Sequence, residues 1–461
     1  MKILKFGGSS VSTPERIKKV IEIIANSRQE NKPIAVVFSA FGGVTDELIE
    51  MSQKAALCDD CYLKQLESLE KRHLDAVKFL IDVRSQSRIL AHVKFMMNEL
   101  EDVLHGVFLI KELTLKTLDF ILSFGERLSS FIISESLQQN KIAAEFLDAR
   151  HIITTDNNFS DANVLPKITE EKIREYFQNH PRLQIVTGFI GATQNNETTT
   201  LGRGGSDFTA ALLGAALDAH EVEIWTDVDG VMTANPNKVP DAFPLHYMTY
   251  EEAMEMSHFG AKVIYPPTIQ PVLEKKIPVR IRNTFNTEFP GTLIQDKITQ
   301  NHDFMLRGLS SVENISILRV QGSGMIGVVG IASRLFSALA RGKINVILIT
   351  QASSEHSICI AVSQNQSQSS KRVVEEEFAL EIETHHIDEI VLEEHLAIIA
   401  VVGANMRHTP GISGKLFQSL GTNNVNVVAI AQGSSELNIS IVVSQKDEAK
   451  ALNAIHQVYF N

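Results

Sequence analysis

The hydrophobic pattern in the first two thirds of the chain alternates between short apolar runs and longer amphipathic stretches. Residues 2–6, 34–39 and 221–225 are apolar enough to be buried strands, and each is followed by a loop rich in glycine or small polar residues. Helical patterns come next, for example the Ala-rich stretch 208–219. Strand, loop and helix in this order are typical of a parallel sheet covered by helices on both faces. We therefore predict an αβα sandwich with a mostly parallel sheet.

A long helical pattern rich in Lys and Glu runs from residue 51 to residue 112. We expect a solvated helical hairpin that either covers the sandwich as a lid or extends it. Cys58 and Cys61 lie in this stretch at a spacing found in redox and zinc sites, but no second pair follows, and Cys359 is far away in the sequence. The three cysteines are therefore interpreted as reduced thiols, although the role of the pair stays open.

Two glycine-rich loops carry the clearest chemical signal. Gly7-Gly8-Ser9-Ser10 follows a strand that contains Lys5, and a helix pattern comes next, which is the outline of a phosphate-binding loop. Gly202-Arg203-Gly204-Gly205-Ser206-Asp207 also joins a strand to a helix. Its Arg can bind a carboxylate or phosphate through two parallel hydrogen bonds, and its Asp can cap the helix or orient a nearby lysine.

Two further loops, residues 40–46 and 226–231, also follow apolar strands. The carboxyl ends of parallel strands meet at one edge of a sheet, and open α/β folds bind their ligands there. The four loops together predict a site for a nucleotide and a small acid.

The last third of the chain contains an internal duplication. Gly322 matches Gly403, Leu335 matches Leu416, and every matching pair lies 81 positions apart without a gap. Each copy has the order strand, glycine turn, helix, strand, strand, helix, which is typical of a ferredoxin-like α+β module. We expect a fourth strand of the first copy at 381–386, and we expect residues 305–309 to supply the missing edge strand of the second.

Composition and charge restrict the possible functions. The chain has 461 residues, 44% of them hydrophobic, and a formal net charge of −12. This charge argues against nucleic acid as a general partner. No apolar run is long enough to cross a membrane and no signal-peptide core is present, so we expect a cytoplasmic protein.

Five segments together resemble the signatures of the aspartate kinases in the amino-acid kinase superfamily, and the resemblance covers the whole chain. They are Lys5–Val11, Ser123–Ser129, Gly202–Asp207, Trp225–Val231 and Phe259–Val263. The resemblance implies transfer of the γ-phosphoryl group of ATP to the β-carboxylate of L-aspartate, with Mg²⁺ accompanying ATP and no metal bound by protein side chains alone. The product is 4-phospho-L-aspartate, at the head of lysine, threonine and methionine biosynthesis.

The same resemblance assigns roles to individual positions. The implied catalytic residues are Lys5 and Asp207. The implied phosphate and ATP contacts are Gly7, Gly8, Ser9, Thr226, Asp227 and Lys262. The implied aspartate contacts are Thr45, Glu126, Arg203, Gly204, Gly205 and Ser206.

Several positions depart from the family pattern. Met232 stands where the family usually has Tyr, and Asn237 stands where it has Arg; both positions belong to the nucleotide site. Tyr265 and Pro267 replace a usual His and Arg. These changes concern ATP affinity more than the reaction, and Lys238 is a candidate to compensate for the missing Arg.

The duplicated modules resemble ACT modules, which are small regulatory domains that bind amino acids. We expect a catalytic domain at 1–298, a linker or strand at 299–313, and ACT modules at 314–392 and 393–461. Gln351 and Gln432 are the predicted effector contacts. Their surroundings favour threonine, and nearby glutamates keep lysine open. We also expect a homodimer or homotetramer formed through these modules.

Two alternative functions stay open. One is a kinase of the same superfamily that phosphorylates another acid, and the other is a non-catalytic, amino-acid-sensing subunit whose ATP site has decayed. The motifs around the effector residues look most like those of enzymes fused to homoserine dehydrogenase. Because the sequence stops at Asn461, before any dehydrogenase would begin, we expect either a stand-alone kinase or a truncated bifunctional protein.

Overall fold

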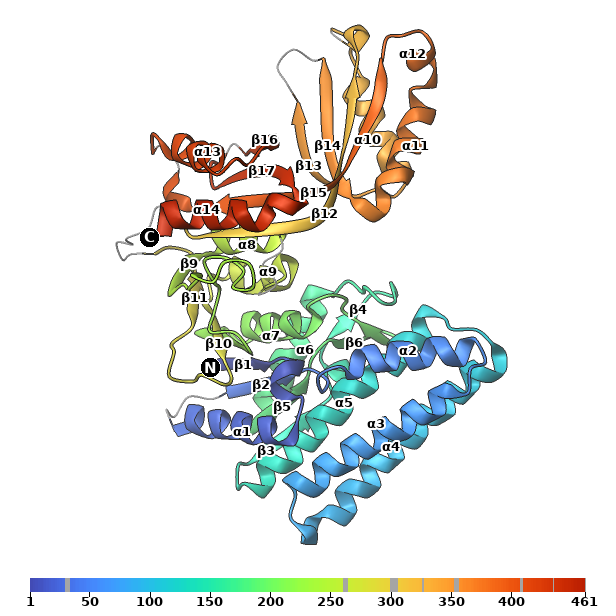
Figure 1. Ribbon diagram of the computed structural model, residues 1–461. Helices are drawn as coiled ribbons and strands as arrows, with labels where there is room; N and C mark the ends of the chain where they lie inside the picture. The colour runs from blue at the N-terminus through green and yellow to red at the C-terminus, as the bar shows by residue number, and fades with distance from the viewer. Residues whose placement is uncertain are drawn as a thin grey trace. The chain divides into compact units, whose positions relative to one another are not determined.

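The computed structural model describes residues 1–29, 34–259, 264–298, 306–325, 327–351, 356–406, 409–433 and 435–460. These residues form two compact units (Figure 1). The first unit contains the described residues of 1–231, 244–250 and 264–298, and the second contains those of 232–243, 251–259 and 306–460.

The first unit is built on a central sheet in which all neighbouring strands are parallel except β10 and β11. The described strands follow the spatial order β3 (Ala144–Leu147), β5 (Leu183–Thr187), β2 (Ile34–Phe38), β1 (Lys2–Phe6), β8 (Glu221–Thr226), β10 (Val279–Asn283), β11 (Thr292–Gln295) and β9 (Tyr247–Thr249). A small second sheet contains β4 (Thr154–Thr155), β6 (Ile190–Thr193) and β7 (Thr198–Thr200). The predicted mostly parallel sheet is confirmed.

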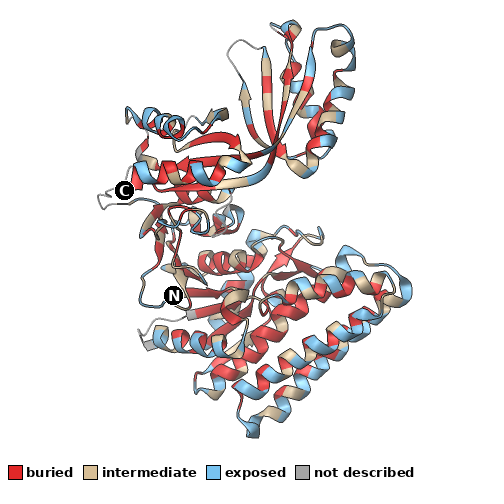
Figure 2. Cartoon of the chain, in the orientation of Figure 1, coloured by how far each residue is buried: buried red, intermediate tan, exposed pale blue. Residues whose placement is uncertain are grey.

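Helices cover both faces of the central sheet (Figure 1). Leu4 and Phe6 of β1 point into a hydrophobic core shared with α1 (Pro14–Gln29) and α5 (Leu115–Gln139). Side chains alternate along a strand, so Lys5 points to the opposite face. That face is covered by α7 (Gly205–Ala216), and two further helices of this unit are α6 (Pro166–Asn179) and α9 (Pro266–Glu274). Figure 2 shows that the strands and α5 are largely buried.

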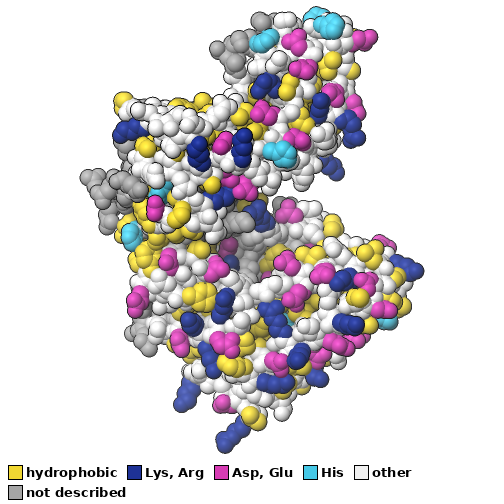
Figure 3. Space-filling view, in the orientation of Figure 1, with side chains coloured by type: hydrophobic (Ala, Val, Ile, Leu, Met, Phe, Trp, Pro, Cys, Tyr) yellow, Lys and Arg dark blue, Asp and Glu magenta, His cyan; other side chains and the backbone are white. Residues whose placement is uncertain are grey.

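The predicted helical hairpin is present as α3 (Cys61–Leu80) and α4 (Val83–Ile110), preceded by α2 (Val44–Ala56). The inner faces of these helices join the main hydrophobic core. Their outer faces carry Lys, Arg, Asp and Glu side chains of mixed sign (Figure 3). Cys58, Cys61 and Cys359 are free thiols, as expected.

The second unit contains two β-α-β-β-α copies joined in one antiparallel sheet. Its described strands follow the order β13 (Val346–Gln351), β14 (Ser357–Ser363), β12 (Gly308–Gln321), β15 (Glu389–Val402), β17 (Asn438–Ser444) and β16 (Val427–Gln432). The helices are α10 (Ile331–Arg341) and α11 (Ser367–Glu377) in the first copy, and α13 (Ile412–Thr422) and α14 (Glu448–Phe460) in the second. Both predicted ferredoxin-like modules are confirmed.

The strand predicted at 381–386 is wrong, because the chain there enters a short helix, α12 (Ala379–Glu383). The first copy instead gains its fourth strand from the start of β15, which pairs with β12 from Glu389 onwards. The predicted edge strand of the second copy is confirmed for the described residues: the Arg307 N–H donates to the Val402 carbonyl at 2.8 Å, and Leu309 pairs with Val401. Met305 lies outside the described residues.

Two segments that precede residue 298 pack within the second unit. Thr233 Oγ1 lies 3.0 Å from His456 Nε2 on α14. Glu252 of α8 (Tyr250–His258) forms a buried ion pair with Arg307, with 3.2 Å between Oε1 and Nε. These contacts fasten α8 and residues 232–243 to the duplicated modules. No helix among the described residues is both long and apolar enough to cross a bilayer.

Candidate active site

The carboxyl ends of β1, β2 and β8 lie at one level of the sheet. Phe6 pairs in register with Phe38 on one side and Trp225 on the other, so the loops that follow these strands start side by side. Lys5 Nζ lies 2.6 Å from Asp207 Oδ1, and both side chains are largely buried. The structure therefore brings together the two residues that the sequence marked as catalytic, one from β1 and one from the first turn of α7.

The first glycine loop fits closely against the loop after β2. The Gly7 N–H donates to the Trp225 carbonyl at 3.2 Å. A Cβ added at Gly8 would lie only 3.1 Å from the Ala40 carbonyl oxygen, so a larger residue would push the two loops apart. The Ser9 carbonyl is held by the Arg16 guanidinium at 2.7 Å. These contacts fix the backbone of Gly7, Gly8 and Ser9, as a phosphate-binding loop requires.

Glu126 is a buried carboxylate with an incomplete set of partners. Its side chain comes from the middle of α5 and is only 3% exposed. Oε1 accepts the Ala40 N–H at 3.1 Å, whereas Oε2 has no hydrogen-bond partner among the described residues. Burial raises the pKa of Glu126 to about 8, against the opposing effects of the Ala40 N–H and the charge of Lys5. A cationic ligand beside Oε2 would favour the ionised form of Glu126 and so offset this shift.

The Gly202–Asp207 loop turns sharply into α7. Gly202 and Gly204 have φ values of 67° and 73°, which favour glycine. Ser206 accepts a hydrogen bond from Ser39 Oγ at 3.1 Å. Arg203 is exposed, and its guanidinium carbon lies 5.4 Å from the centre of the Tyr265 ring. Tyr265, one of the departures from the family pattern, is thus a direct neighbour of the predicted carboxylate-binding Arg.

The other residues predicted to bind the nucleotide or aspartate lie at the end of β8 and at the start of α2, or outside the described residues. Thr226 Oγ1 donates to Asp227 Oδ1 at 3.2 Å at the exposed end of β8. Thr45 is half-buried in the first turn of α2, after Gly43. Lys262 lies outside the described residues. The ammonium group of Lys238, the candidate to compensate for the missing Arg, lies 2.6 Å from the Glu448 carboxylate within the second unit.

Three residues of the site were missed by sequence reasoning. Ser39 binds Ser206, and Arg72 of α3 donates to the Gly42 carbonyl at 2.8 Å, which ties the helical hairpin to the loop before α2. Asp119 of α5 accepts hydrogen bonds from the end of β7. Ser39 could have been found from its place directly after β2, but Arg72 and Asp119 lie within helices and carry no local signal.

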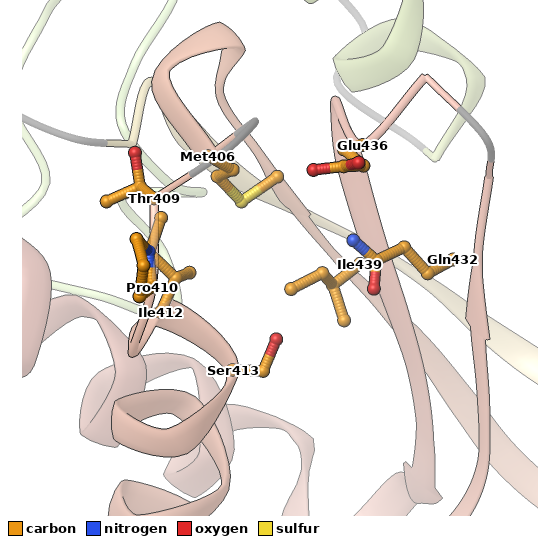
Figure 4. A pocket seen from close by; sticks show the side chains of 8 residues that line it. All are labelled: Met406, Thr409, Pro410, Ile412, Ser413, Gln432, Glu436 and Ile439. Atoms are coloured by element: carbon orange, nitrogen blue, oxygen red, sulfur yellow. The ribbon is translucent and has the colours of Figure 1, made fainter.

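A second candidate site lies in the second ferredoxin-like copy. A cavity of about 370 Å³ opens between the end of β16, the start of β17 and the start of α13 (Figure 4). It is lined by Met406, Thr409, Pro410, Ile412, Ser413, Gln432, Glu436 and Ile439. Gln432, the residue predicted to contact an effector, is therefore one of the residues that line this cavity. Gln351 occupies the equivalent place at the end of β13.

The sequence matches the amino acid kinase family over residues 1–283, and the ACT domain over residues 318–378 and again over 399–459. The chain belongs to the amino acid kinase family, with tandem ACT domains after the kinase domain. Within this family its similarity is to the aspartokinases, as the sequence motifs had indicated.

Three curated relatives illustrate this similarity. The bifunctional aspartokinase/homoserine dehydrogenase 2 of Arabidopsis thaliana is 37% identical over 463 residues, which cover 99% of this chain and 50% of that protein. The bifunctional protein of Haemophilus influenzae is 35% identical over 100% of this chain and 57% of its own length. Aspartokinase 1 of A. thaliana is 35% identical, over 99% of this chain and 80% of its own. The chain thus spans about half the length of the bifunctional relatives.

Solved structures agree with this assignment. E. coli aspartokinase III in complex with aspartate and ADP has a TM-score of 0.84 at 26% identity, covering 100% of both chains. The same enzyme with lysine and aspartate has a TM-score of 0.79 at 27% identity. The aspartate kinase of Clostridium acetobutylicum has a TM-score of 0.83 at 25% identity. Each comparison covers the whole of both chains.

Proposed function

We propose that this chain transfers the γ-phosphoryl group of ATP to the β-carboxylate of L-aspartate. The observation that carries the proposal is the Lys5–Asp207 pair, with 2.6 Å between Nζ and Oδ1, at the edge of the sheet beside the Gly7-Gly8 loop and the buried Glu126. The family membership and the E. coli structure with aspartate and ADP support the same reaction.

The chemistry needs few side chains. A free aspartate β-carboxylate has a pKa of about 3.9, so it is already ionised at neutral pH and needs no general base. Catalysis then consists of holding the reactants in line and stabilising negative charge on the transferring phosphoryl oxygens. Lys5 supplies that charge stabilisation with the N–H group of Gly8, while Gly7, whose N–H donates to the Trp225 carbonyl, lets the loop backbone come close to the phosphate. Asp207 holds the Lys5 ammonium group in place.

Mg²⁺ would enter with the nucleotide. Magnesium usually keeps several waters and binds phosphate oxygens with one or two carboxylates, so it needs no cluster of protein ligands. Among the described residues, no group of three or more His, Cys, Asp or Glu side chains is arranged to hold a metal. Asp227, at the exposed end of β8, would be one such carboxylate. The ion would neutralise phosphate charge.

Aspartate would be recognised at both of its charged ends. Glu126 offers a buried oxygen for the ammonium group, and Arg203 offers a two-pronged donor for a carboxylate. Ser206 and Thr45 would add hydroxyl contacts to aspartate, and Gly204 and Gly205 would let the loop backbone come close to it. Thr226, Asp227 and Lys262 would bind the nucleotide.

A hydroxamate assay tests the reaction. Purified chain, ATP, Mg²⁺ and aspartate should form an acyl phosphate that hydroxylamine traps. Product with glutamate or another acid, but not with aspartate, would favour the kinase for a different acceptor. No product with any acid would favour a non-catalytic sensing subunit.

We infer that the cavity at Gln432 binds a regulatory amino acid, and we propose threonine. Gln432 and Ser413 can donate to and accept from a small hydroxyl amino acid, and the Glu436 carboxylate can receive its ammonium group (Figure 4). Lysine is the alternative, because E. coli aspartokinase III has been solved with lysine. Titrating threonine and lysine against activity, in the wild type and in Gln432→Ala and Gln351→Ala, decides between them. Threonine inhibition untouched by both substitutions would reject this site.

Two further proposals concern the state of the protein in the cell. We propose a homodimer or homotetramer formed through the ACT modules. A cytoplasmic location stays a prediction, and the plant relatives are described as chloroplastic.

A further inference from the structure

Asp119 is a buried carboxylate that the proposed chemistry does not use. It lies on α5 about two turns before Glu126 and is 0% exposed. Its Oδ2 accepts the N–H groups of Ser160 at 2.8 Å and Thr200 at 3.0 Å, and its Oδ1 accepts the Thr200 hydroxyl at 2.7 Å. Burial raises the pKa of Asp119, and the hydrogen bonds from Ser160 and Thr200 oppose this shift.

These three hydrogen bonds hold the backbone at the entry to the Arg203 loop. Thr200 is the last residue of β7, directly before that loop. The segment after Ser160 is fastened to the same place, because the Ala162 N–H donates to the Thr200 carbonyl at 3.0 Å. A Cβ on Gly202 would lie 2.4 Å from Asp161 Oδ1, so this segment also packs directly against the loop.

We propose that Asp119 is a positioning residue that sets the place of Arg203 relative to Glu126. One rigid helix then fixes both recognition points for the amino-acid substrate, Glu126 directly and Arg203 through the end of β7. An acceptor must be held at both charged ends for its reacting carboxylate to meet the phosphoryl group in line. The inference rests on the proposed function and adds a residue that acts through Arg203.

The test compares Asp119→Ala and Asp119→Asn with Ser134→Ala as a matched control. Ser134 is also buried on α5, beyond Glu126, and its Oγ has no hydrogen-bond partner in the described part of the chain. Asp119→Ala should raise the KM for aspartate about tenfold to a hundredfold and leave the KM for ATP within about twofold. Asp119→Asn should raise the KM for aspartate less, since the amide oxygen can still accept hydrogen bonds from both N–H groups. Ser134→Ala should change neither KM.

A double-mutant cycle with Arg203→Ala separates positioning from general support of the fold. If Asp119 acts through Arg203, adding Asp119→Ala to the Arg203→Ala variant should change the KM for aspartate little further. Independent effects of the two changes, or equal increases in both KM values, would overturn the inference. If Asp119→Ala does not fold, Thr200→Val takes its place, because it removes only one of the three hydrogen bonds. It should raise the KM for aspartate and leave the KM for ATP unchanged. A wild-type chain that forms no aspartyl hydroxamate would instead refute the proposed function.

An independent set of contacts links the Gln432 cavity to α8, a helix inside the stretch that matches the kinase family. Asn438 Nδ2 donates to Glu255 Oε2 at 3.0 Å, and the next residue, Ile439, lines the cavity. On the other side, the Ala404 N–H donates to Glu252 Oε1 at 3.0 Å, in the same short turn as the cavity residue Met406. Both edges of the cavity are thus hydrogen-bonded to one helix.

We also propose that α8 carries the effect of a ligand in this cavity to the kinase domain. Glu255→Ala should keep basal activity and threonine binding, measured by calorimetry, within about twofold while reducing the maximal inhibition by threonine. Glu251→Ala, at an exposed position of the same helix, is the matched control and should change nothing. Unchanged inhibition in Glu255→Ala would overturn the proposal, and so would a loss of inhibition fully explained by lost threonine binding. Inhibition of the wild type by neither threonine nor lysine would refute the proposed effector instead.

Discussion

The buried carboxylate of Glu126 makes aspartate binding depend on pH. Its pKa in the empty site is about 8, because burial disfavours the charged form. With that pKa, the ionised fraction is about 1% at pH 6 and about half at pH 8. If only the ionised form accepts the substrate's ammonium group, the KM for aspartate should fall roughly fiftyfold between pH 6 and pH 8 and then level off.

The measurement is the KM for aspartate at saturating ATP, from pH 6 to pH 9, by the hydroxamate assay. Glu126→Gln removes the titrating group, so this variant should bind aspartate weakly with a KM that no longer depends on pH in this range. The KM for ATP is the internal control and should follow a different profile. A wild-type aspartate KM that is flat from pH 6 to pH 8 would refute the reasoning.

The same shift has a consequence for stability. The pKa of Glu126 in the folded protein lies above its ordinary value of 4.5, so the folded state holds the extra proton between pH 4.5 and about 8. The free energy of unfolding should therefore fall as pH rises through this window, by about 4 kcal/mol between pH 4.5 and pH 8. Glu126→Gln should lose this slope and melt at a higher temperature than the wild type at pH 8, by calorimetry.

Three further substitutions probe the site. Arg203→Ala should cost about 2–5 kcal/mol in kcat/KM for aspartate, whereas Arg203→Lys should mainly raise the KM; near wild-type kinetics would rule out the carboxylate assignment. Lys5→Met should reduce kcat with little change in the aspartate KM, because its contact belongs to the transition state; an unchanged kcat would contradict that role. Tyr265→Ala should cost about 0.5–1 kcal/mol in aspartate binding through the lost cation–π contact with Arg203, and no effect on the aspartate KM would show that this contact is idle.

Much of the site could be predicted from the sequence, because its chemistry lies in loops directly after strands. The alternation of β1 already places Lys5 on the face opposite Leu4 and Phe6, and the structure shows Asp207 on that face. Asp119 could not be found in this way. Its partner Thr200 is 81 positions away, and a lone Asp within a helix is usually exposed.

The strand predicted at 381–386 is wrong for a similar reason, because contacts with residues distant in the sequence decide the local structure. Its sequence alternates in a manner compatible with either a strand or a helix, and tertiary contacts decide between them. Arg334 of α10 binds both Glu377, the last residue of α11, and Glu381 of α12. Its guanidinium carbon lies 4.7 Å from the centre of the buried Phe378 ring. These contacts hold the end of α11, the turn at Phe378 and the start of α12 around one guanidinium group, and so favour the short helix over a strand.

The duplication leaves the same strand of each copy at the edge of the shared sheet. β12 and β15 each pair on both sides, so the outermost strands are β13 and β16. Each carries an exposed isoleucine at the equivalent position, Ile349 at 50% and Ile430 at 45% exposure. An exposed apolar edge strand is a template for pairing with another chain, and this supports the proposed homo-oligomer. Ile349→Asp combined with Ile430→Asp should therefore reduce the mass measured by light scattering to that of one chain without unfolding it. A wild type that is monomeric at micromolar concentration, or an oligomer that survives both substitutions, would show that these strands do not form the contact.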